Sequence, residues 1–244
     1  MPNEFSRTNW RRAADNLALG ENEIHVWLVT TTELEVNLAS YAGLLSSAEQ
    51  ARAGKFIFDK DRRLYTIAHA ALRSILSKYA QTAPAGLQFD AGTNGKPKLP
   101  TDLPGDLRFN LSHSGDSALV AVSRGREIGI DIEFVNADFA FDEVAVRFFT
   151  TSEVAALRAL PNRLQRQAFY QCWTSKEAFL KAKGTGLSGE LDVVEIIVDR
   201  EEYVRIDAHV PGWSLAEIDP GEGYVGALAS EGEPPTMQLY RWRP

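Results

Sequence analysis

The sequence predicts an α+β protein built from two similar α/β halves. The expected elements follow the order strand, helices, strands, helices, strands. The helical block at 48–80 also resembles the block at 150–183, because a glutamate, Glu49 or Glu153, lies at the start of each. This repetition suggests a duplicated unit.

Length and composition set the class of protein. The 244 residues are 44% hydrophobic and 24% charged, enough to bury a full core without disulfides, and the single cysteine cannot form one within the chain. The net charge of −7 disfavours a general nucleic-acid binder, although a local basic cluster could hold a small anion. No apolar run approaches ~18 residues and the N-terminus lacks a secretory pattern, so we expect a cytoplasmic protein that does not span a membrane.

The first half is expected to begin with an apolar, β-rich strand at 24–29. Ser46 or Ser47 followed by Glu49 is typical of a helix start, and helical spacing over 48–80 indicates two helices broken near 59–61. Residues 81–106 are rich in turn-forming residues and read as a loop with short strands.

The second half is expected to be richer in strands. Strands at 107–111, 118–123 and 128–134 are predicted, the last two forming a hairpin through Gly125, with the polar stretch 112–116 as a loop. Helices follow at 141–183, with Thr150 or Ser152 as the cap before Glu153, a break at Pro161, and Gly184 and Gly186 at the end. The tail at 191–242 reads as several antiparallel strands.

A strand with alternating acids carries the first chemical signal. In Ile128-Gly129-Ile130-Asp131-Ile132-Glu133 the isoleucines share one face, while Asp131 and Glu133 share the other and Gly129 leaves space beside them. Paired carboxylates on a rigid strand suit Mg²⁺, which prefers oxygen ligands and often takes phosphate oxygens as well. The alternative is a solvated edge strand with outward-facing acids.

A helical motif carries the second signal. Trp173, Glu177 and Lys181 are spaced by four residues and therefore share one helix face. Glu177 could supply a third carboxylate or act as a base, and Lys181 could hold a phosphate. The alternative is a surface ion pair beside a core aromatic, worth ~0.3–0.5 kcal/mol.

Several residues could hold an anion, since arginine grips phosphate with two donors and lysine supplies a compact charge. The candidates are Arg52, Arg62, Arg63, Lys96, Ser112 and His113. Taken singly, each could equally be a solvated side chain. The sequence contains neither a G-x-S-x-G nucleophile elbow nor a P-loop, which disfavours a serine hydrolase and a P-loop nucleotide enzyme.

Together these motifs resemble the 4′-phosphopantetheinyl transferase superfamily, in particular its longer, pseudo-dimeric Sfp-like branch. The matching stretches are F-N-L-S-H-S-G-D at 109–116, I-G-I-D-I-E at 128–133, F-F-T-T-S-E at 148–153 and W-T-S-K-E-A-F-L-K-A-K-G-T-G-L at 173–187, with E-x-x-R-x-x-x-F at 49–56 and G-K-P at 95–97 upstream. The resemblance implies the fold of that family, with halves at 1–106 and 107–244 related by pseudo-twofold symmetry.

The resemblance also implies roles for individual residues. Asp131, Glu133 and Glu177 would bind Mg²⁺, with Mn²⁺ possible. Glu177 and Lys181 would be catalytic, Glu177 as ligand, base or both. Contacts to coenzyme A would come from Arg52, Arg62, Gly95, Lys96, Pro97, Ser112, His113, Asp131, Glu177 and Lys181. One departure is Ala68-His69-Ala70, where many relatives carry an arginine that His69, or Arg62 with Arg63, would have to replace.

The implied reaction moves the 4′-phosphopantetheine arm of coenzyme A onto a serine of an apo carrier protein and releases 3′,5′-ADP. The expected partners are acyl, polyketide or nonribosomal-peptide carriers, by family analogy in secondary metabolism, and two halves in one chain favour a monomer. Alternatives are a Mg-dependent coenzyme A or nucleotide pyrophosphatase, which would use water as the nucleophile, and a non-catalytic carrier-binding module.

Overall fold

The structure is a computed structural model that describes residues 9–14, 17–33, 38–92, 95–100, 105–186, 195–198 and 206–244. Among these residues no helix has the length and apolar character needed to cross a membrane. The chain divides into two compact units. The described part of the first unit lies within Asn9–Gly125 and Pro235–Pro244, and that of the second within Arg126–Pro234.

This division differs from the expected boundary at 106/107. Strands β4 (Leu107–Ser114) and β5 (Ser117–Arg124) pair with each other, and β5 pairs with β1 (Glu23–Thr30), so both belong to the sheet of the first unit. The last strand, β11 (Thr236–Arg241), also joins that sheet. In the sequence, the second unit is therefore inserted between β5 and β11 of the first.

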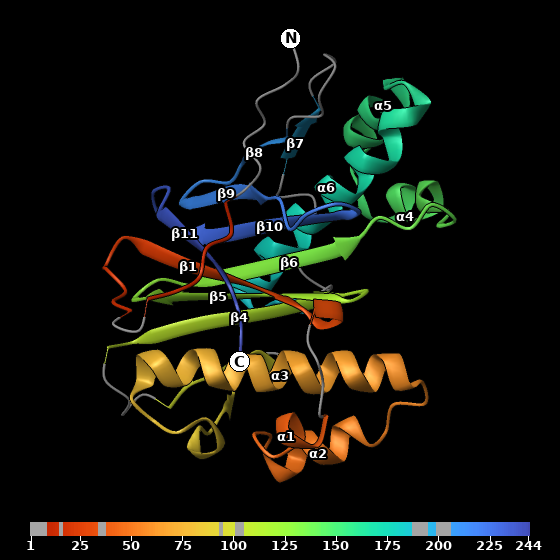
Figure 1. The fold of residues 1–244 in the computed structure, drawn as a ribbon. Coiled ribbons are helices and arrows are strands. Elements are labelled where there is room, and N and C mark those ends of the chain that lie inside the picture. Colours follow the sequence, from red (N-terminus) through yellow and green to blue (C-terminus); the bar gives the residue numbers. More distant parts are fainter. Residues whose placement is uncertain are drawn as a thin grey trace. The chain divides into compact units, whose positions relative to one another are not determined.

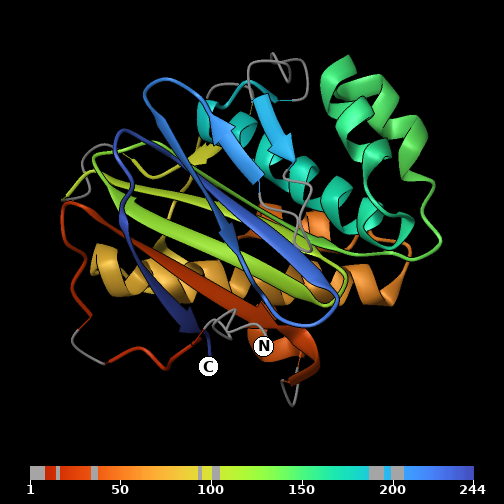
Figure 2. The same ribbon diagram turned by 90° about the horizontal axis from the view of Figure 1, so that it is seen from above.

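The sheet of the first unit has the strand order β11-β1-β5-β4. Figure 2 shows β11 beside β1, and these two strands run parallel, with Trp27 opposite Tyr240. The expectation of an entirely antiparallel C-terminal tail is therefore wrong for β11. Because the second unit lies between β1 and β11 in the chain, β11 approaches the sheet from a distant point, and local sequence pattern does not encode its direction.

Helices cover one face of this sheet. Figure 1 shows α3 (Asp59–Ala80) alongside the sheet, with α1 (Leu38–Ala42) and α2 (Ser47–Ala53) beyond it. The break between α2 and α3 lies at 54–58, slightly before the expected position. The remaining elements of the unit are the short helical turns η1 (Thr31–Glu33) and η2 (Pro84–Gly86) and the two-residue strands β2 (Asp90–Ala91) and β3 (Pro97–Lys98).

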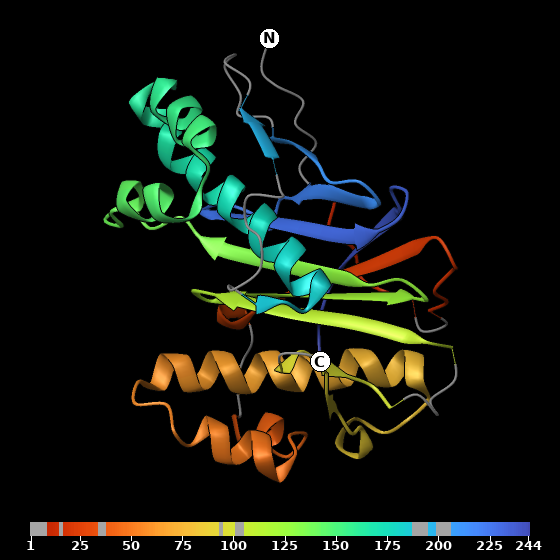
Figure 3. The ribbon, with the colours of Figure 1, turned by 180° about the vertical axis from the view of Figure 1, so that it is seen from behind.

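The second unit has a three-stranded sheet in the order β6-β10-β9. Its elements are β6 (Ile128–Phe134), α4 (Phe141–Phe148), α5 (Thr151–Ala159), α6 (Asn162–Lys183), β7 (Glu195–Val198), β8 (Ile206–His209), β9 (Trp213–Ile218) and β10 (Tyr224–Glu231). Figure 3 shows α6 crossing the face of β6 and β10. Gly184 ends α6 in the left-handed conformation, φ 66°, as expected.

Two local expectations are corrected by the strand pairing. The predicted hairpin between 118–123 and 128–134 does not form, because β5 pairs with β4 and β1, whereas β6 pairs with β10. Ser112 and His113 lie within β4, opposite Leu119 and Ala118, rather than in a loop. Backbone pairing with β5 keeps this polar end of β4 in the strand. Its polar composition alone had suggested a loop.

The two units repeat one topology, which confirms the prediction of two similar halves. In each, a first strand precedes three helices, and two later strands complete an antiparallel sheet with the first strand at one side: β1-β5-β4 in one unit and β6-β10-β9 in the other. The longest helix is the third in both, and α3 and α6 each have 22 residues.

Candidate active site

Strand β6 supplies the carboxylates of the candidate site. Its alternation places Ile128, Ile130 and Ile132 on one face, all at most 1% exposed. Asp131, on the other face, is only 2% exposed because α6 lies over it. The alternative of a solvated edge strand is therefore wrong for Asp131. A buried carboxylate requires a partner, since burying an unpaired charge is costly.

Helix α6 supplies that partner. Lys181 Nζ donates to Asp131 Oδ1 at 2.5 Å, so the lysine of the helical motif meets the first acid of the strand motif. Lys181 is 30% exposed while Asp131 is buried, which places this charge-assisted bond at the edge of the core. The pair joins residues 50 positions apart in the sequence.

Glu177 lies one turn before Lys181 on the same helix face and close to Asp131. Burial raises the pKa of Glu177 above its ordinary value, and the Asp131 carboxylate raises it further, while Lys181 acts in the opposite direction. The structure therefore brings Asp131, Glu177 and Lys181 together, as expected. A half-buried carboxyl with a raised pKa is a suitable proton acceptor at neutral pH.

Glu133 lies two residues after Asp131 on β6. It is half-buried and close enough to Tyr170 for its charge to contribute to raising the pKa of that phenol, after the larger effect of burial. Among the described residues, no three His, Cys, Asp or Glu side chains form a group that could hold one metal ion. The ligand set of Asp131, Glu133 and Glu177 therefore stays a prediction. In this structure Lys181 supplies the positive charge next to Asp131.

The space that Gly129 was expected to leave beside the carboxylates is filled by α6. A Cβ built on Gly129 would lie 2.0 Å from Ala178 O and 2.3 Å from Ala182 N. The glycine therefore allows the strand and helix backbones to approach closely.

A buried ion pair next to Glu177 was not predicted from the sequence. Lys176 Nζ lies 2.9 Å from Glu153 Oε1, with the side chains 0% and 2% exposed. Glu153 also closes the capping box of α5, where it accepts a hydrogen bond from Thr150 N at 2.8 Å. The pair ties the start of α5 to α6 at the residue before Glu177. The capping motif at Thr150 and Glu153 could have been recognised in the sequence. Nothing in the sequence indicated that Lys176 is buried.

The remaining candidates belong to the first unit. Arg52 is exposed near the C-terminal end of α2, and Arg62 is exposed and paired with Asp59 at 2.7 Å. On β4, Ser112 is buried and His113 exposed, so their side chains point to opposite faces of the strand.

Gly95 and Lys96 lie between β2 and β3, and Pro97 is the first residue of β3. Gly95 has φ 81°, and Lys96 O accepts a hydrogen bond from Gly92 N at 2.8 Å. Arg63, a further candidate, is half-buried on α3 and donates to Thr31 O at 3.3 Å.

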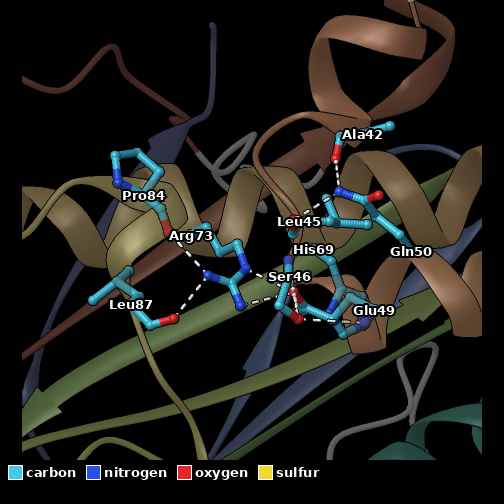
Figure 4. A network of polar contacts seen from close by, with 9 residues as sticks. All are labelled: Ala42, Leu45, Ser46, Glu49, Gln50, His69, Arg73, Pro84 and Leu87. Carbon is cyan, nitrogen blue, oxygen red and sulfur yellow. Dashed lines mark hydrogen bonds and ion pairs between the residues drawn. The ribbon is translucent and has the colours of Figure 1, made fainter.

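His69 lies in a polar network that the sequence did not predict (Figure 4). Its Nδ1 is 3.1 Å from Glu49 Oε1, and the buried Arg73 binds Glu49 Oε2 at 2.7 Å. Burial alone would raise the pKa of Glu49, but hydrogen bonds with His69, Ser46 and Arg73 outweigh it and lower the pKa to about 2. His69 and Arg73 are thus bound to Glu49 within the first unit.

Comparison of the sequence with known proteins shows which family the chain belongs to. Residues 127–229 match the 4′-phosphopantetheinyl transferase superfamily, and residues 27–125 match the family described as 4′-phosphopantetheinyl transferase, N-terminal. The chain is 37% identical to the 4′-phosphopantetheinyl transferase HetI of Nostoc sp., over 96% of each chain. It is 32% identical to the 4′-phosphopantetheinyl transferase Sfp of Bacillus subtilis, over 74% of this chain and 80% of that protein. The chain therefore belongs to the 4′-phosphopantetheinyl transferase superfamily.

Proposed function

We propose that this protein transfers the 4′-phosphopantetheine group of coenzyme A to a serine of an apo carrier protein. The observation that carries the proposal is the meeting of Asp131, Glu177 and Lys181 at the β6–α6 junction. This junction lies within the segment that matches the superfamily, and the relatives HetI and Sfp are named as enzymes of this activity.

The reaction makes one bond and breaks another. The serine oxygen bonds to the β-phosphorus of coenzyme A, the phosphoanhydride bond to the α-phosphate breaks, and 3′,5′-ADP leaves with the bridging oxygen. The serine proton needs an acceptor, and Glu177 is the carboxylate we assign to that task. Its raised pKa makes it a better proton acceptor than an ordinary glutamate.

In this scheme the Lys181 ammonium binds the negatively charged diphosphate of coenzyme A. Its ammonium is bound to Asp131 and remains 30% exposed, so a substrate phosphate oxygen can approach it from solvent. A fixed ammonium next to the diphosphate stabilises the charge that develops on the leaving group. Asp131 fixes the position of that ammonium.

A divalent cation fits the donor set, because Asp131 and Glu177 are neighbouring carboxylates with mutually unfavourable charges. Asp131 and Glu177 would hold Mg²⁺ or Mn²⁺, and Glu133, two residues further along the strand, is the third candidate ligand. When bound, such an ion neutralises charge on phosphate oxygens. In the first unit, Arg52, Arg62, Gly95, Lys96, Pro97, Ser112 and His113 are proposed contacts to coenzyme A, by resemblance to the family.

Mass spectrometry of carrier proteins tests the proposal. The protein is incubated with coenzyme A, Mg²⁺ and a panel of apo carriers of the acyl, polyketide and nonribosomal-peptide types, with Glu177→Gln as the matched inactive variant. Transfer adds one phosphopantetheine group to the carrier serine. A pyrophosphatase would instead release free phosphopantetheine and leave every carrier unmodified, and a binding module would do neither.

A further inference from the structure

The backbones of β6 and α6 meet at Gly129. A Cβ at this position would lie 2.0 Å from Ala178 O, 2.3 Å from Ala182 N and 2.9 Å from Ala182 Cα. All three atoms are helix backbone, so no side-chain rotation could relieve the overlap. Any residue larger than glycine requires the helix, the strand or both to move.

The two helix residues at this contact directly follow the two charged residues of the candidate site. Ala178 follows Glu177, and Ala182 follows Lys181. On the strand, Gly129 precedes Asp131 by two residues and shares its face. A displacement of the helix at Ala178 and Ala182 therefore moves Glu177 and Lys181 relative to Asp131.

The first unit shows the same topology with larger side chains at this level. Thr30 of β1 pairs with the first residue of β5, as Phe134 of β6 pairs with the first residue of β10. Counting back from these pairs, Trp27 corresponds to Asp131 and His25 to Gly129.

Aromatic side chains fill the corresponding space in the first unit. Trp27 Nε1 donates to Tyr79 Oη of α3 at 3.0 Å, and His25 Nδ1 lies 2.8 Å from the same oxygen. All three side chains are buried. In the first unit, aromatic rings thus lie between β1 and α3. In the second unit, Gly129 lets the backbones of β6 and α6 touch.

We propose that Gly129 is a positioning residue, which sets the β6–α6 contact so that Lys181 and Glu177 reach Asp131. The expected effect on kcat rests on the proposed function. The expected displacement of α6 rests only on the backbone contact at Gly129. Lengthening the 2.0 Å contact between the Cβ and Ala178 O to the 3.0 Å that real Cβ atoms keep needs a shift of about 1 Å. Misplacement of that size can lower a rate by about 100-fold.

Gly129→Ala tests the proposal in the full-length chain. Steady-state kinetics give kcat and the KM values for coenzyme A and carrier. Circular dichroism gives the folded fraction, and a crystal structure gives the Lys181 Nζ–Asp131 Oδ1 distance. We expect kcat per folded molecule to fall by about 100-fold, with KM for the carrier within about twofold. We also expect the Lys181–Asp131 hydrogen bond to be lost. A folded variant with unchanged kcat, or with this bond intact, overturns the proposal.

Two further variants separate positioning from stability. Ile130→Val removes a methyl group from the opposite, buried face of β6, so it lowers stability while leaving kcat unchanged. If Gly129→Ala does not fold, Ala182→Val adds bulk at a buried helix residue whose backbone faces Gly129, and the same criteria apply to it. If the wild-type protein transfers nothing, the proposed function fails, whereas the distance in the variant crystal still decides the positioning role.

Discussion

Arg73 and Lys176 occupy the same place in two different helices: each is the fifteenth residue of a 22-residue helix. Each pairs with the capping-box glutamate of the short helix that precedes it, Arg73 with Glu49 at 2.7 Å and Lys176 with Glu153 at 2.9 Å. The position after Lys176 is Glu177, whereas the position after Arg73 is a serine. The ion pair thus occurs in the first unit without a neighbouring glutamate that corresponds to Glu177. We therefore infer that the pair joins helices in both units and takes no part in the reaction.

Removing one member of the buried pair should strongly destabilise the second unit. Lys176→Met leaves the Glu153 carboxylate buried without its ammonium partner, and we expect a loss of about 3–5 kcal/mol in the free energy of unfolding. Lys176→Met combined with Glu153→Gln should recover part of that loss. Urea denaturation measures both.

The exposed pair of Arg158 with Asp142 is the matched control, since Arg158→Gln should leave the urea midpoint unchanged. A Lys176→Met variant as stable as this control would contradict the account.

Stability should fall in acid because of Glu49. Its folded pKa of about 2 is lower than the ordinary glutamate value of 4.5, so the folded state binds a proton less readily than the unfolded state. The stabilisation is complete above the unfolded pKa and disappears as pH falls from about 4.5 towards 2. Its full size is roughly 3 kcal/mol.

Unfolding free energies measured in urea between pH 6 and pH 3 test the role of Glu49. Wild type should lose stability over that range, and Glu49→Gln should be less stable at pH 6 but should lose less as the pH falls. Equal pH dependence in the two proteins would show that Glu49 is not responsible.

Metal binding should depend on the carboxylates of the second unit. We expect the wild-type protein to bind Mn²⁺, detected as loss of the free-ion signal in electron paramagnetic resonance, and Asp131→Asn to weaken that binding at least about tenfold. Glu177→Gln should weaken it as well. Asp142→Asn, which removes an exposed carboxylate of α4, is the control. Mn²⁺ affinity unaffected by Asp131→Asn would remove Asp131 from the ligand set.

Cys172 should be inert in the folded protein. It is 1% exposed, and burial raises the pKa of its thiol well above the ordinary range. Iodoacetamide at pH 8 should therefore modify it only after unfolding, as read by mass. Fast alkylation of the native protein, with activity lost in parallel, would mean that this thiol is accessible and near the site.

Local patterns predicted the parts of this fold that depend on local physics. Alternation along β6 separated the isoleucines from Asp131. Pairs of candidate capping residues marked two helix starts, where Ser46 and Thr150 are the caps observed, and two glycines marked the end of α6, which lies at Gly184. The four-residue spacing of Glu177 and Lys181 placed both on the helix face that meets Asp131. These features follow from backbone geometry within a few residues.

Features that depend on distant partners were not predictable in the same way. The parallel pairing of β11 with β1 joins the two ends of the chain, and β6 pairs with β10 rather than with its neighbour in sequence. Charged residues usually read as exposed, so Arg73 and Lys176 gave no sign that they are buried. The contact at Gly129 was read as open space because its occupant, α6, lies about 50 residues away in the sequence.

The most direct test of the reacting centre is a crystal structure with coenzyme A and Mn²⁺, in which anomalous scattering locates the ion. The account predicts an anomalous peak within bonding distance of the Asp131 and Glu177 carboxylates, with the diphosphate beside it and Lys181 on a phosphate oxygen. A diphosphate bound away from the β6–α6 junction, with Asp131, Glu177 and Lys181 untouched, would contradict it.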